Sequence, residues 1–84
     1  MLFRSYPNPT TGILTVEFTA AVAGDHQITV TDLSGRLVTD KVVKAVGGST
    51  SVLEMDLSVA GEGFYMLYIR DPKGSIAVSK VTVE

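Results

Sequence analysis

The chain of 84 residues is long enough for one domain with a single hydrophobic core, and it contains no cysteine, which excludes disulfides and thiolate metal sites. Hydrophobic residues make up 45% and charged residues 19% of the sequence, which is the balance of a folded domain and not of a disordered tail. The net charge is −2 with scattered lysines and arginines, which predicts no binding to nucleic acid, and no apolar run approaches the roughly 20 residues that span a bilayer.

The first element is a short edge strand near residues 2–6, followed by the stiff segment Tyr6-Pro7-Asn8-Pro9. Each proline fixes φ and removes a backbone N–H, so neither a helix nor a central strand can run through this segment. Tyr6 and Asn8 each precede a proline, which favours extended geometry. We therefore expect a rigid, extended approach to the first long strand.

Hydrophobicity then alternates with a period of two, as expected of strands that bury one face. Residues 63–71 are apolar on both faces, which predicts a central strand. In the last segment Ile76 and Val78 point one way and Ala77, Val81 and Val83 the other, which we interpret as a β-bulge near Ser79 and Lys80. The predicted strands are 2–6, 13–19, 26–33, 36–45, 50–56, 63–71 and 75–84.

Two turns between these strands share one pattern, with aspartate first and glycine fourth. Asp32-Leu33-Ser34-Gly35 and Asp71-Pro72-Lys73-Gly74 both fit a type I turn followed by a left-handed glycine, which predicts two hairpins. No segment of ten or more residues keeps a helical period, so we expect no substantial helix. About seven short antiparallel strands in one small domain predict an all-β sandwich, because a single sheet would leave one apolar face in water.

Catalytic chemistry is not indicated by the sequence. The single histidine, His26, has no evident nucleophile beside it, and we interpret it as a surface or edge histidine. The five aspartates are well separated and fall mostly at turns, which favours turn formation over a calcium site. The aromatic residues are expected to pack in the core or in an interface and not to form a sugar-binding platform. We predict no enzyme, no cofactor and no metal site.

Several motifs occur in an order that resembles the type A C-terminal sorting domain of the type IX (Por) secretion system. The resemblance covers nearly all of residues 6–84 and is specific as an ordered set, although no single motif is. The motifs are Tyr6-Pro7-Asn8-Pro9 with Gly12, the segment 28–38 with its Asp32-Leu33-Ser34-Gly35-Arg36 turn, Asp56-Leu57-Ser58, the strand Gly63-Phe64-Tyr65, and the closing Lys80-Val81-Thr82-Val83.

The resemblance implies an Ig-like antiparallel β-sandwich over residues 1–84, at the end of a longer exported protein of the Bacteroidota. Such a domain is a non-catalytic signal that outer-membrane translocon and shuttle proteins read, and a surface sortase then removes it from an N-terminal cargo. The protein would pass through the periplasm and reach the cell surface or the medium. Family members often end on a basic residue, whereas this chain ends on Glu84 with Lys80 nearby.

The motif residues have structural interpretations beside recognition. The proline segment either holds the domain at a defined angle to its cargo, with the segment before Tyr6 open to cleavage, or caps the edge of the sandwich, and the two are compatible. Gly63 would let a strand start close against a neighbour, and Tyr65 would fill the core with its hydroxyl at the rim. The recognition candidates are Tyr6, Pro7, Asn8, Pro9, Gly12, Asp32, Gly35, Arg36, Gly63, Tyr65, Lys80, Val81 and Val83.

Two hypotheses on function follow. In the first, the last hairpin, residues 63–71 and 75–84, carries the sorting signal through a sheet edge or an exposed apolar stripe, because an unpaired strand edge can bind a partner strand. In the second, the domain is an Ig-like structural, carbohydrate-binding or adhesion module that stays on the mature protein.

Overall fold

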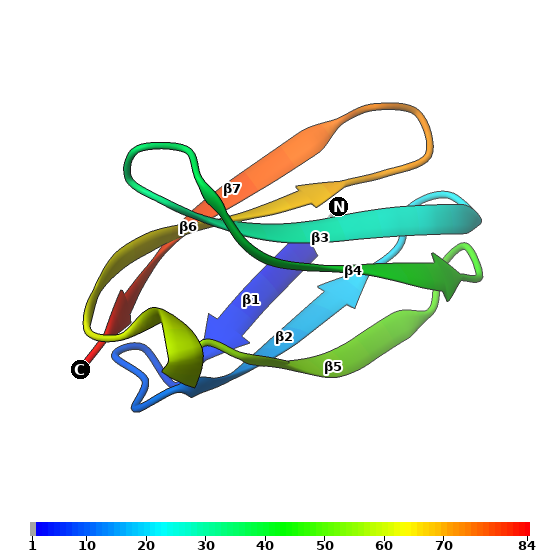
Figure 1. The fold of residues 1–84 in the computed structure, drawn as a ribbon. Coiled ribbons are helices and arrows are strands. Elements are labelled where there is room, and N and C mark those ends of the chain that lie inside the picture. Colours follow the sequence, from blue (N-terminus) through cyan, green and yellow to red (C-terminus); the bar gives the residue numbers. More distant parts are fainter. Residues whose placement is uncertain (1) are drawn as a thin grey trace.

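The computed structural model describes residues 2–84. This part of the chain contains seven strands and one short 3-10 helix, joined by turns and loops. They form two antiparallel sheets packed face to face (Figure 1). The three-stranded sheet has the order β1 (Leu2–Tyr6), β2 (Ile13–Thr19), β5 (Thr50–Asp56). The four-stranded sheet has the order β4 (Leu37–Ala45), β3 (Gly24–Asp32), β6 (Gly63–Arg70), β7 (Ile76–Val83). The predicted all-β sandwich is confirmed.

The strand order is that of an Ig-like sandwich with one strand displaced. β1, β2 and β5 occupy the A, B and E positions of a constant-type Ig domain, and β3, β6 and β7 occupy C, F and G. The fourth strand, β4, pairs with β3 and not with β5, because the short turn after Asp32 returns the chain directly alongside β3. The segment predicted to be central, 63–71, is β6, and it lies between β3 and β7 as expected.

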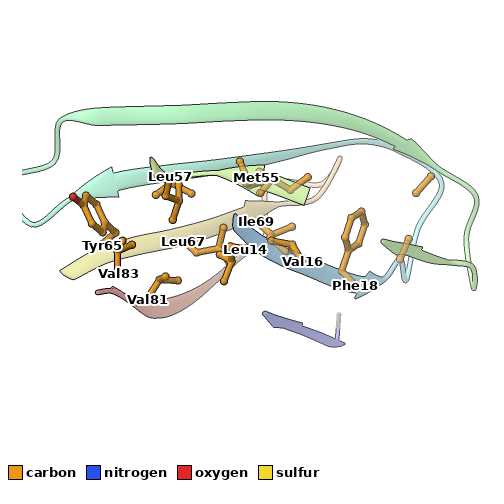
Figure 2. Close-up of a cluster of buried hydrophobic side chains, with 14 residues drawn as sticks. Leu14, Val16, Phe18, Met55, Leu57, Tyr65, Leu67, Ile69, Val81 and Val83 are labelled. Carbon is orange, nitrogen blue, oxygen red and sulfur yellow. The ribbon is translucent and has the colours of Figure 1, made fainter. Parts of the chain in front are cut away.

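The core lies between the two sheets and is built from the inward-facing residues of each strand. Leu14, Val16 and Phe18 of β2 face the second sheet, which contributes Leu67 and Ile69 of β6 among others. Figure 2 shows these side chains in one layer, with Phe18 and Tyr65 toward opposite ends. Each fully buried leucine or phenylalanine contributes about 1.5–3 kcal/mol through removal of its apolar surface from water. Without disulfides, this layer is the main source of stability.

Both predicted hairpin turns are present and have the same hydrogen bonds. Gly35 N–H donates to the Asp32 carbonyl at 3.1 Å, and Gly74 N–H donates to the Asp71 carbonyl at 3.0 Å. The two glycines have φ values of 90° and 91°, a region that favours glycine. In each turn the aspartate Oδ1 also accepts two backbone N–H groups, which explains why aspartate stands first.

The bulge predicted near Ser79 and Lys80 is wrong. β7 pairs with β6 in one unbroken register from Gly63–Val83 to Arg70–Ile76, and the irregularity of the sheet lies instead between β3 and β4 at Val30 and Thr31. Ala77, Ser79, Val81 and Val83 all share the inward side, with the polar Ser79 only half-buried. Ile76 and Val78 are simply exposed on the outer face, so no change of facing is needed.

The interpretation of His26 as a surface or edge residue is also wrong. His26 is fully buried in β3, on the inward side that Ile28 and Val30 share, and its ring lies 5.1 Å from that of Phe18. Its Nδ1 lies 3.0 Å from the Gly24 carbonyl, which can only accept, so Nδ1 carries the proton. Nε2 has no hydrogen-bond partner among residues 2–84. His26 is therefore a core residue.

Candidate recognition surface

The recognition candidates gather toward one end of the sandwich, the end at which Glu84 lies (Figure 1). β1 runs toward this end, so Tyr6 and the proline segment lie there, while Leu2 lies beside Thr19 toward the opposite end. The pairing of the strands brings distant motifs together: Tyr65 lies opposite Asp32 on one side and opposite Val81 on the other.

The proline segment does not form the extended approach that we predicted. The backbone bends at residues 7–9, and the peptide bonds before Pro7 and Pro9 are both cis. The segment before Tyr6 is not open either, because residues 2–6 form β1 and pair with β2 along their whole length. Contacts with β7 join the bent segment to the other sheet.

Asn8 and Thr10 bind the outer edge of β7. The Asn8 side-chain amide donates to the Lys80 carbonyl at 3.1 Å, and its Oδ1 accepts the Thr82 N–H at 3.0 Å. Thr10 N–H donates to the Thr82 carbonyl at 2.9 Å, and its carbonyl accepts the Glu84 N–H at 2.9 Å. These four hydrogen bonds complete the edge of β7 at its C-terminal half. We name this set of contacts the edge cap. It corresponds to the second interpretation of the proline segment, in which the segment caps the edge of the sandwich.

Gly12 follows the edge cap in a conformation that favours glycine. Its φ is +146°, and a Cβ built on it would lie 3.1 Å from Cβ of Ser58. Its carbonyl accepts the Leu57 N–H at 2.7 Å. The motif glycine therefore allows a close crossing between the start of β2 and the 3-10 helix Ser58–Ala60.

Tyr65 ties the start of β6 to the loop before it. The side chain is buried in the core, and its hydroxyl lies 2.7 Å from the Ala60 carbonyl and 2.8 Å from the Gly61 carbonyl. This is the arrangement of a tyrosine corner in Ig-like domains. Gly63, two residues earlier, has a φ of +147°, but a Cβ there would meet nothing closer than 3.9 Å. Its requirement for glycine is thus one of backbone conformation and not the close approach that we predicted.

Asp32 stabilises the first hairpin turn as an ionised group. Hydrogen bonds from the Ser34 hydroxyl and from the backbone N–H of Arg36 and Ser34 lower the pKa of the Asp32 carboxyl. The Arg36 Nε lies 3.7 Å from Asp32 Oδ2, and its side chain is largely exposed, so this ion pair adds little. Asp56 repeats the device with Ser58, whose hydroxyl and N–H lower the pKa of that carboxyl.

The outer face of β6 and β7 carries an exposed apolar surface. The sequence predicted a sheet edge or an apolar stripe on this hairpin but did not indicate which residues would form the stripe. Phe64, Ile76 and Val78 are each about half-exposed, and Met66 and Tyr68 lie between them with intermediate burial. Tyr6 is exposed too, so of the two places expected for the aromatics, core or interface, Phe64 and Tyr6 do not occupy the core. The sequence signal was the apolar character of both faces of 63–71. We name these five residues, Phe64, Met66, Tyr68, Ile76 and Val78, the outer stripe.

Two cations flank the outer stripe. Lys80 Nζ lies 4.4 Å from the centre of the Phe64 ring, a cation–π contact, and Arg70 is exposed at the other end of β6. On the part of β3 that pairs with β6, the residues of this face are Gln27, Thr29 and Thr31, none of which is charged.

A catalytic arrangement is not found among residues 2–84. The described part of the chain holds no group of three histidine, cysteine, aspartate or glutamate side chains that could bind a metal ion. None of the helices described is long and apolar enough to cross a membrane. What the surface offers is strand backbone and apolar area, the features by which proteins bind other proteins.

Comparison with protein-family models gives a match that covers nearly all of the chain. Residues 4–84 match the family described as the secretion system C-terminal sorting domain. The search of curated proteins gave no match. The match covers nearly the whole chain and includes every recognition candidate, and the family is one of non-catalytic signals of type IX secretion. The chain therefore belongs to the secretion system C-terminal sorting domain family.

Proposed function

We propose that this domain directs an attached cargo through the outer-membrane translocon of the type IX system by means of the β6–β7 hairpin, and that a surface sortase then removes it. Family membership makes the domain a type IX secretion signal that acts with the secretion system and an N-terminal cargo. The observation that carries the assignment to the hairpin is the outer stripe, an exposed apolar surface beside a strand that ends its sheet.

The position of the hairpin supports this role. Cargo would join ahead of Leu2, whereas β7 is the last strand described and lies in the other sheet. A translocon or shuttle protein can thus bind the outer face of β6 and β7 while cargo hangs from β1. Since β1 is paired with β2, the sortase would cut ahead of Leu2 and not within the proline segment. The domain would act in the periplasm, and the cargo would end at the cell surface or in the medium.

A fusion experiment tests the role of the hairpin. Residues 1–84 are joined to a neutral passenger behind an export signal in a bacterium that has this secretion system, and the passenger is measured at the surface and in the periplasm. We expect Val78→Asp to retain the passenger in the periplasm, because it places a charge in the outer stripe. Val42→Asp, on the exposed outer face of β4, is the matched control and should be exported. Equal export of both variants would refute the assignment to the hairpin.

Removal of the domain is tested on the exported passenger. Mass spectrometry of the surface form should find no peptide from residues 2–84. A surface form that keeps the segment Asp71 to Glu84 would instead support an Ig-like module that remains on the mature protein.

A further inference from the structure

We propose that the uncovered half of the β7 edge binds an extended, acidic protein segment, which adds to the four-stranded sheet as a fifth strand. The segment would carry two acidic residues, four positions apart, with an apolar residue between them. This inference rests on the proposed function, since it names the chemistry of a partner for the same hairpin.

The backbone of β7 is completed by the edge cap over only part of its length. The Lys80 carbonyl, the Thr82 N–H and carbonyl and the Glu84 N–H all bind Asn8 or Thr10, so the even-numbered residues of β7 point their backbone groups away from β6. By the period of a strand, the N–H and carbonyl groups of Ile76 and Val78 and the N–H of Lys80 point the same way. No residue among 2–84 takes them up, and β7 ends its sheet. These groups can accept a short partner strand.

The side chains beside this edge define the chemistry of the partner. Ile76 and Val78 are about half-exposed, so the partner residue that lies across from Val78 should be apolar. Lys80 lies on the same face, and Arg70 lies opposite Ile76 on the next strand. The strand positions of the two cations differ by four residues, which is about 13 Å in a strand. Acidic residues four apart on one face of an extended segment match this spacing.

The same charges disfavour a second copy of the chain at this edge. A two-fold pairing centred on Val78 would place Lys80 of one copy across from Ile76 of the other, close to its Arg70. The like charges would repel, which disfavours this pairing. Charge complementarity therefore selects a partner of opposite charge.

A peptide titration of the whole domain tests the inference. The probe is the heptapeptide Thr-Glu-Thr-Val-Thr-Glu-Thr, acetylated and amidated, whose symmetric sequence presents the same side chains in a parallel or antiparallel strand. The control probe replaces both glutamates by lysine. Binding is followed by NMR, and we expect saturable shifts and slowed amide exchange at Ile76, Val78 and Lys80 with the acidic peptide alone.

Three variants locate the binding. Lys80→Glu should weaken binding about five-fold, the effect of one exposed ion pair, while Lys44→Glu, on the same face at the opposite edge of the sheet, should leave it unchanged. Val78→Pro removes an outward N–H and should abolish binding. If the proline variant does not fold, the comparison of Lys80→Glu with Lys44→Glu still tests the site.

Several results would overturn the inference: equal binding of the lysine peptide, shifts at another strand, no saturable shift, or dimerisation of the free domain through β7. If no acidic peptide binds while Val78→Asp still blocks export, the proposed function stands and the strand-addition inference fails. If peptide binds but Val78→Asp is exported normally, the strand-addition inference stands and the assignment of the signal to the hairpin fails.

Discussion

Replacement of Tyr65 by phenylalanine should destabilise the domain through loss of a single hydroxyl. This hydroxyl lies within 2.8 Å of two carbonyl oxygens, those of Ala60 and Gly61, and the tyrosine ring is buried. Loss of one such hydrogen bond costs about 1 kcal/mol, and carbonyls left without a donor raise the cost to about 2 kcal/mol. For a domain of this size, we expect the melting temperature to fall by about 5–15 °C.

Thermal and urea unfolding of the purified domain measure this effect. Tyr68→Phe is the matched control, because Tyr68 lies on the same strand but on the outer face, where no hydrogen bond to its hydroxyl is found among residues 2–84. Its stability should stay within about 0.5 kcal/mol of the parent. If the two variants lose equal stability, or if Tyr65→Phe loses none, the structural explanation of the Gly63-Phe64-Tyr65 motif is refuted.

Three further predictions concern other motif residues. Asn8→Ala should lower the free energy of unfolding by about 1 kcal/mol and speed amide exchange at Thr82, measured by NMR, because the edge cap loses its side-chain hydrogen bonds. Unchanged exchange at Thr82 would contradict the role of Asn8 in the edge cap. Gly12→Ala should destabilise by about 1–3 kcal/mol in urea unfolding, since φ is +146° and Ser58 lies close; a neutral substitution would refute this reason. The lowered pKa of Asp32 contributes stability that is fully present above the unfolded pKa of about 3.9 and is lost as pH falls through the folded pKa. In Asp32→Asn, the free energy of unfolding should therefore fall less steeply as the pH is lowered through this range. Parallel curves for parent and variant would argue against it.

Local patterns predicted most of the fold. Two long strands, β2 and β5, have the bounds expected from their alternation, and both hairpins follow from the aspartate and glycine positions of their turns. These features depend on residues that are neighbours in the chain or on one face of a strand, which a sequence displays directly. His26 could have been placed by the same rule, since it shares its parity with Ile28 and Val30.

Contacts between distant residues limited the prediction of the site. The bonds of Asn8 to β7 join residues 72 and 74 positions apart, so nothing near Asn8 in the sequence announces them. The geometric preference of residues before proline predicted an extended segment, and these long-range bonds coincide with a bend instead. The bulge was inferred because β7 has apolar residues on both faces. The true reason is that its outer face forms part of the outer stripe.

The structure separates two kinds of residue in the sorting domain. Asn8, Gly12, Asp32 and Tyr65 each have a hydrogen bond or a backbone conformation that the fold itself requires. Their order in the sequence therefore identifies the sandwich, whether or not a partner touches them. The side chains of the outer stripe have no such role among residues 2–84. Phe64, Ile76 and Val78 expose apolar surface to water, and contact with apolar groups of a partner would be more favourable than this exposure. Substitutions of the first kind should reduce export in proportion to lost stability, whereas those in the outer stripe should reduce export of a domain that remains folded.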